Sequence, residues 1–151
     1  MEKSAIAAYL HYVGFMVSFA ALTVEQLSLK PELTLKESWR IVIADAVYGI
    51  AATLVLVTGI LRVLYFGQGS DFYTQNPVFW AKIIAFLIVG TISLYPTVTF
   101  ILWVGTLRAG SPPKLPEAMV SRLRRVIQWE LLGFVAIPLL ASLMAKGIGL
   151  T

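Results

Sequence analysis

The chain of 151 residues contains no cysteine, and only 13% of its residues are charged. The absence of cysteine excludes disulfides, thiolate metal sites and cysteine nucleophiles, and leaves the redox compartment open. Soluble globular domains have about 25% charged residues and about 45–50% apolar residues, whereas 58% of this chain is hydrophobic. The shortage of charge therefore indicates an integral membrane protein.

Motifs for hydrolysis and for nucleotide chemistry are missing as well. The sequence has no GxSxG, no HExxH, no P-loop and no dinucleotide-binding fingerprint, so those classes of enzyme have no residue support. The net charge of +4 does not require nucleic acid, because basic residues collect in the cytoplasmic loops of membrane proteins. We expect no nucleic-acid partner, and whether the chain is an enzyme stays open.

Long apolar runs are what the sequence has in abundance. Hydropathy predicts four spans, near residues 5–25, 42–66, 78–103 and 126–145, each long enough for the roughly 20 residues that a spanning helix needs. The expected fold is all-α, a four-helix transmembrane bundle in a lipid bilayer. Because the spans and their loops nearly exhaust the chain, we expect residues 1–151 to form a single integral membrane domain.

The distribution of basic residues predicts the orientation. The loops after the first and third spans hold eight lysines and arginines, and the opposite side holds four. Since basic residues favour the cytoplasmic side, both termini are expected to be extracytoplasmic. The first apolar run continues to Val24 and Glu2 offsets Lys3, unlike a cleaved signal peptide, so we expect the run to be retained as a span.

Ionisable residues within the spans mark the candidate sites, because such residues usually face the bundle interior, a cavity or a partner. His11, Ser18 and Glu25 are seven residues apart and therefore share one stripe of the first span. At 1.5 Å per residue, however, His11 and Glu25 are separated by roughly 21 Å. The sequence thus predicts two polar layers with an apolar middle.

The layer toward the cytoplasmic side combines three carboxylates with several arginines. We interpret it as a structural ionic layer in which arginine satisfies each carboxylate through two hydrogen bonds. The alternative is a site that handles protons. The residues of this layer are Glu25, Arg40, Asp45, Glu130, Arg122 and Arg125.

The outer layer contains the only histidine of the sequence together with two cations, Arg62 and Lys82. A lone histidine either hydrogen-bonds a neighbouring helix or ligates haem iron. The two cations could receive haem propionates, or the headgroup of an anionic lipid or quinone-like ligand. A sixth haem ligand would be Met16, Met144, Lys82 or a tyrosine. The candidate haem site is therefore His11, Arg62, Lys82 and Met144.

Three ordered segments carry a resemblance: YLHYVGF in the first span, ADAVYGIAATLVLVTGILRVLYFG in the second and NPVFWAKIIAFLIVGTISLYPT in the third. Together they resemble an uncharacterised bacterial four-helix membrane family, domain of unknown function 2214, over essentially the whole chain. The resemblance implies a multi-pass protein of the bacterial cytoplasmic (inner) membrane.

That family in turn is similar to copper-resistance-D-like proteins and to membrane protoporphyrinogen oxidases. In the oxidases a first-span histidine, a second-span TG motif and a third-span W-x-x-K-like motif recur, and here His11, Thr58-Gly59 and Trp80 with Lys82 correspond to them. The resemblance implies that His11 is a haem b ligand and that Lys82 is a cation on the propionate side. The segment VEQLSLKPELT lacks the further basic and aromatic signatures of the oxidases, so shared architecture is expected rather than porphyrin oxidation.

Two functional hypotheses follow from these patterns. In the first, the protein binds haem b in its outer pocket and acts in membrane redox or porphyrin metabolism. In the second, it is a non-catalytic accessory or assembly subunit without a cofactor, whose partner is another membrane protein or a second copy. A carrier for a small ion or metal has the least support, since no set of four ligands is visible.

Overall fold

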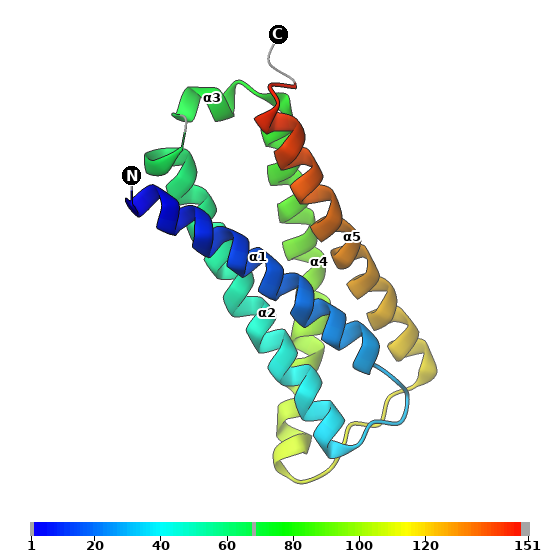
Figure 1. The fold of residues 1–151 in the computed structure, drawn as a ribbon. Helices are drawn as coiled ribbons and strands as arrows, with labels where there is room; N and C mark the ends of the chain where they lie inside the picture. The colour runs from blue at the N-terminus through cyan, green and yellow to red at the C-terminus, as the bar shows by residue number, and fades with distance from the viewer. Residues whose placement is uncertain (1, 68, 149–151) are drawn as a thin grey trace.

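The computed structural model describes residues 2–67 and 69–148, and throughout this part of the chain the regular structure is helical. Four long helices are apolar enough to cross a membrane, which confirms the predicted all-α bundle of four transmembrane helices. A short helix lies between the second and third of them (Figure 1). The elements are α1 (Glu2–Ser28), α2 (Leu35–Leu61), the π-helical segment η1 (Arg62–Phe66), α3 (Ser70–Thr74), α4 (Pro77–Arg108) and α5 (Glu117–Ala145).

The long helices are arranged as two hairpins, α1 with α2 and α4 with α5 (Figure 1). The start of α1 and the end of α5 lie at one end of the bundle, which we call the terminal end. The connections at 29–34 and 109–116 lie at the other, which we call the loop end. The hairpins approach each other toward the loop end and diverge toward the terminal end, where α3 bridges between them. This divergence makes room for a site at the terminal end.

Glycines allow the helices to approach closely within each hairpin. A Cβ added at Gly14 of α1 would lie 3.2 Å from the carbonyl oxygen of Ala51 and 3.1 Å from Cγ2 of Val55, both on α2. A Cβ added at Gly133 of α5 would overlap Cγ2 of Val89 on α4. The hydrophobic effect does not drive helices together in lipid, so close van der Waals packing must hold them. Small residues at such positions allow that packing.

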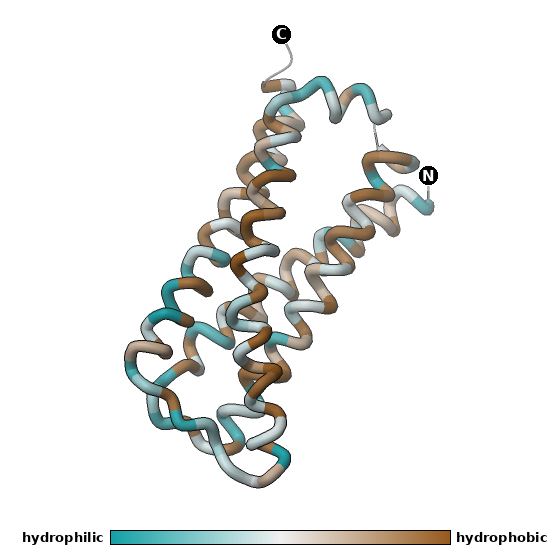
Figure 2. Tube along the Cα trace, turned by 180° about the vertical axis from the view of Figure 1, so that it is seen from behind, coloured by the Kyte–Doolittle hydropathy of each residue, from teal (hydrophilic) through white to brown (hydrophobic). Residues whose placement is uncertain are grey.

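The outer surface of the bundle is suited to lipid. Large apolar side chains are exposed along all four long helices, for example Ile50 on α2 and Leu102 on α4. Figure 2 shows hydrophobic residues along the lengths of the helices and hydrophilic residues mainly toward the two ends of the bundle. Because lipid tails, unlike water, impose no cost on exposed apolar surface, this pattern agrees with a bundle embedded in a bilayer.

The start of α2 is fixed by a capping box. The side chain of Thr34 accepts a hydrogen bond from the backbone N–H of Glu37 at 3.2 Å, and the backbone N–H of Thr34 donates to the Glu37 carboxylate at 2.9 Å. Lys30 adds an ion pair to Glu37 at 2.7 Å. These contacts place the helix start at residue 35, seven residues before the predicted span.

We expect Thr34→Ala to lower the free energy of unfolding by about 1 kcal/mol, because it leaves an N-terminal N–H of α2 without its acceptor. Thr53→Ala is the matched control, since the Thr53 hydroxyl is exposed and donates only to the Gly49 carbonyl of its own helix. Denaturant unfolding in detergent micelles measures both variants. Equal stability of the two variants would contradict a stabilising cap.

Candidate functional site

His11 is held by α2, and its contacts fix the position of the ring proton. Nδ1 lies 3.0 Å from the carbonyl oxygen of Val55 and 3.0 Å from Oγ1 of Thr58. Because a carbonyl can only accept, Nδ1 must carry the hydrogen. The Thr58 hydroxyl donates its own hydrogen to the carbonyl of Leu54 at 2.6 Å, so it too accepts from His11. In the neutral ring, Nε2 therefore keeps a free lone pair.

Gly59 makes room for this histidine. A Cβ at position 59 would lie 3.3 Å from Cε1 of His11, which is tighter than an ordinary van der Waals contact. The Thr58-Gly59 pair thus has two separate tasks, because threonine accepts from the ring and glycine leaves space beside it. The resemblance to the oxidases singled out this pair, but the contacts that explain it come from the structure.

His11 lines two neighbouring cavities between the hairpins, of about 430 Å³ and about 310 Å³. Arg62, Lys82 and Met144 line the larger one together with His11, so the structure brings all four predicted residues to a single cavity. The smaller one is largely apolar, with Lys82 at its wall. Both volumes fall in the range of about 300–1,000 Å³ that is typical of ligand sites.

The two cations of the larger cavity contact aromatic rings rather than carboxylates. The guanidinium carbon of Arg62 is 5.4 Å from the centre of the Tyr12 ring, and Nζ of Lys82 is 5.0 Å from the centre of the Phe79 ring. Within residues 2–67 and 69–148, neither cation forms an ion pair with an acid. The cavity therefore carries two positive charges available to an anionic ligand.

Arg62 is also the first residue of η1, where the i→i+5 pattern replaces the α-helical one. Such π-helical turns are rare and occur frequently at functional sites. Nothing in the residue pattern indicates this change of helix type, because the apolar pattern of the second span runs on through Phe66.

The structure separates the candidates for a second axial ligand. Met144 is buried and lines the larger cavity, as does Lys82. Met16, in contrast, is 61% exposed on the outside of α1 and lines neither cavity. Two aromatic residues of the larger cavity, Phe72 and Tyr73 of α3, were missed by the sequence analysis. The feature of the sequence that could have identified them is a pair of adjacent aromatic residues within an otherwise polar loop.

The second polar layer lies toward the loop end, deep in the bundle. The side chains of Glu25 on α1 and Glu130 on α5 are both 0% exposed, and Asp45 on α2 is nearly as buried. Thr97 of α4 donates its hydroxyl hydrogen to the Asp45 carboxylate at 2.7 Å. Tyr48 is adjacent to Glu130. The predicted carboxylates therefore do share one layer, contributed by α1, α2 and α5.

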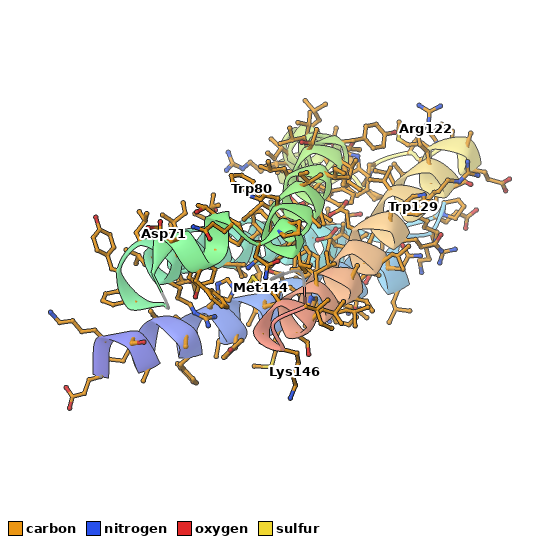
Figure 3. All side chains as sticks on the ribbon, turned by 90° about the horizontal axis from the view of Figure 1, so that it is seen from above. Asp71, Trp80, Arg122, Trp129, Met144 and Lys146 are labelled. Carbon is orange, nitrogen blue, oxygen red and sulfur yellow. The ribbon has the colours of Figure 1, made fainter. Side chains whose placement is uncertain are left out.

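The ion pairs predicted for these carboxylates are wrong. Arg40, Arg122 and Arg125 are exposed, and the one ion pair in the described part of the chain joins Lys30 to Glu37. On α5 the buried stripe consists of Val120, Leu123, Ile127 and Glu130, so the arginines between these positions fall on the outer faces of the helix. Figure 3 shows Arg122 at the periphery of the bundle.

The buried acids do not form a metal site as they stand. Among residues 2–67 and 69–148, no group of three or more His, Asp or Glu side chains is arranged to hold a metal ion. The carboxyl oxygens of Glu25 and Glu130 also have no hydrogen-bond partner among these residues. Such unpartnered buried groups are rare in proteins.

Comparison with known proteins identifies the family and nothing narrower. A family model described as "Predicted membrane protein (DUF2214)" matches residues 3–149. No curated protein and no solved structure matches the chain, so the similarity to copper-resistance-D-like proteins and protoporphyrinogen oxidases has no support from these comparisons. Since the match spans nearly all of the sequence, the chain belongs to this family of membrane proteins.

Proposed function

We propose that the cavities beside His11 bind haem b, with Nε2 of His11 as a ligand to the iron. The observation that carries this proposal is the hydrogen bond from Nδ1 of His11 to the Val55 carbonyl. Histidines that ligate metals usually donate the other ring N–H to a carbonyl or carboxylate, which fixes both the tautomer and the orientation. His11 has this arrangement and lines both cavities.

The remaining wall of the cavities fits the other parts of a haem. An apolar lining that includes Phe15, Val63 and Ile137 suits a flat macrocycle and would keep water away from it. Arg62 and Lys82 would form charge-assisted hydrogen bonds with the two propionates. Met144 would be a further ligand to the iron, because histidine and methionine together hold haem iron in other proteins.

A bound haem b would supply one-electron redox chemistry, and the chain would tune it through its own residues. Val55 and Thr58 orient His11, and the two cations would neutralise the propionates. The role that follows is in membrane redox or porphyrin metabolism, within the cytoplasmic membrane of a bacterium. The rival function is an accessory or assembly subunit without a cofactor, bound to another membrane protein or to a second copy.

Visible spectroscopy distinguishes the two functions. The protein is expressed with ample haem supply, purified in mild detergent and examined oxidised and reduced; cofactor-free protein is then titrated with haem. Haem ligation predicts a Soret band that shifts on reduction and a titration that saturates at an equimolar ratio. A colourless protein that takes up no added haem would contradict the proposal and favour the accessory function.

The cations of the cavity provide a quantitative prediction. A hydrogen bond to a charged group contributes about 1.5–3 kcal/mol, so Arg62→Gln and Lys82→Gln are each expected to weaken haem binding by roughly 10- to 150-fold. The Soret band at saturating haem should remain, because His11 is intact. Lys36→Gln, at an exposed position near the loop end, is the matched control. Unchanged affinity in both cavity variants would exclude propionate recognition by these residues.

A further inference from the structure

The carboxyl groups of Glu25 and Glu130 take no part in the proposed haem site, yet they are the most unusual polar groups in the bundle. Each side chain is fully buried, and none of the four carboxyl oxygens forms a hydrogen bond of good geometry among the described residues, although the Tyr48 hydroxyl lies close to Glu130. An ionised carboxylate in such surroundings is very costly unless a cation or several donors stabilise it. We propose that Glu25 and Glu130 form a proton-binding site inside the membrane.

The charged and titratable groups around this site can be named helix by helix. Asp45 and Tyr48 face the site from α2, and α4 contributes the hydroxyls of Ser93 and Thr97 but no ionisable group. The nearest arginines in sequence, on α2 and α5, are exposed and form no ion pair with the acids. Within residues 2–67 and 69–148 no cation therefore pairs with these carboxyls, and binding a proton would remove the cost of burying their charge.

Two observations favour the proton over a metal cation. The acids are not arranged to hold a metal ion, as stated above. The hydroxyl groups nearby are suited to exchanging protons, because each can both donate and accept. Thr97 already donates to Asp45 at 2.7 Å, and Tyr48 lies next to both Glu130 and Ser93.

A separate cavity offers space for water beside the hydroxyls that neighbour these acids, although neither Glu25 nor Glu130 lines it. It has a volume of about 230 Å³ and lies between α2, α4 and α5, and its wall includes Tyr48, Ser93 and Thr97. One water needs only about 10–15 Å³ of such space together with two or more polar partners. Uptake of a proton from water forms an O–H bond on Glu25 or Glu130, and release returns the proton to water. No electron transfer or co-reactant is involved.

Infrared spectroscopy of the carboxyl groups tests the proposal directly. The full chain in lipid nanodiscs is perfused with buffers of increasing pH, and the C=O stretch of protonated carboxylic acid is followed. We expect a signal that persists at neutral pH and disappears under alkaline conditions. Glu25→Gln and Glu130→Gln should each remove part of that signal. Glu32→Gln, at an exposed loop position, should leave it unchanged.

A measurement of stability against pH covers the possibility that a variant folds poorly. If the folded state holds protons that the unfolded chain has already released, the stability of the wild type must fall as the pH rises above the range where exposed carboxyls titrate. Glutamine mimics a protonated glutamate, so the double variant Glu25→Gln/Glu130→Gln should fold and show a smaller fall. A neutral-pH C=O signal that is identical in all variants, or an unchanged pH dependence of the double variant, would overturn the proposal.

Discussion

Replacing His11 by alanine is expected to abolish the Soret band and to reduce haem binding below detection. The substitution removes Nε2, the proposed iron ligand, while the cations Arg62 and Lys82 stay in place. The hydroxyl of Thr58 keeps its own acceptor, Leu54, so α2 loses no internal hydrogen bond. Spectra of the purified variant, oxidised and reduced, provide the measurement.

Two further variants separate loss of a ligand from loss of the fold. Tyr9→Ala lies on the same helix, is exposed and lines neither cavity, so it should keep the haem. His11→Gly leaves space for a free imidazole, and adding imidazole should restore the Soret band. If His11→Ala retained an unaltered spectrum, or if Tyr9→Ala lost the haem equally, histidine ligation would be wrong.

The second large effect concerns the contact between α4 and α5. Gly133→Ala would bring a methyl group onto Cγ2 of Val89, and valine cannot swing away easily because it is stiff at χ1. Overpacking of this kind costs about 1–3 kcal/mol. We therefore expect a lower free energy of unfolding for Gly133→Ala, measured by denaturation in micelles.

A double-mutant cycle shows whether the clash is the cause. Combining Gly133→Ala with Val89→Ala removes the atom that obstructs, so the pair should be less destabilised than the sum of the single variants. Gly105→Ala on α4 is the control, because a Cβ there meets nothing within 4 Å and alanine favours a helix over glycine. Additive effects in the cycle would mean that the two helices do not meet at this contact.

The four-helix architecture could be predicted from the sequence because polar groups are costly in lipid. Segments that span the membrane are therefore apolar and stand out in a hydropathy profile. Four apolar runs gave four helices, although each helix extends beyond its predicted span. The extensions depend on local capping, such as Thr34 with Glu37, which average hydropathy does not report. Average hydropathy does not report local backbone geometry either, so the helix α3 and the π-helical turn of η1 were not predicted.

The structure brings His11, Arg62 and Lys82 to one cavity, as their grouping by depth predicted. Their role in binding haem stays a prediction. Near the loop end, depth placed arginines beside the carboxylates, but the rotation of each helix points Arg122 and Arg125 outward. Long basic side chains at such positions are able to reach lipid headgroups, which would then take the place of the predicted acid partners.

Methionine illustrates the same distinction. Met16 and Met144 were both named as possible haem ligands, and only Met144 was placed in the candidate site. The structure separates them because one faces lipid and the other faces the cavity. Apolar residues lie on every side of α1, so hydropathy alone does not assign a methionine to a face. The polar stripe of His11, Ser18 and Glu25 marks the interior face of this helix.

The separation of the two polar layers has an electrical consequence. His11 and Glu25 lie 14 residues apart on α1, at most about 21 Å along the helix axis, which is about two thirds of a hydrocarbon core about 30 Å thick. Moving one elementary charge across the whole membrane changes its energy by about 2.3 kcal/mol per 100 mV. The energy of a unit charge at the carboxyls and the energy of a unit charge at His11 therefore respond to voltage differently, by up to about 1.5 kcal/mol per 100 mV. Membrane voltage would therefore shift the protonation of the carboxyls near the loop end and the charge of the site at His11 by different amounts.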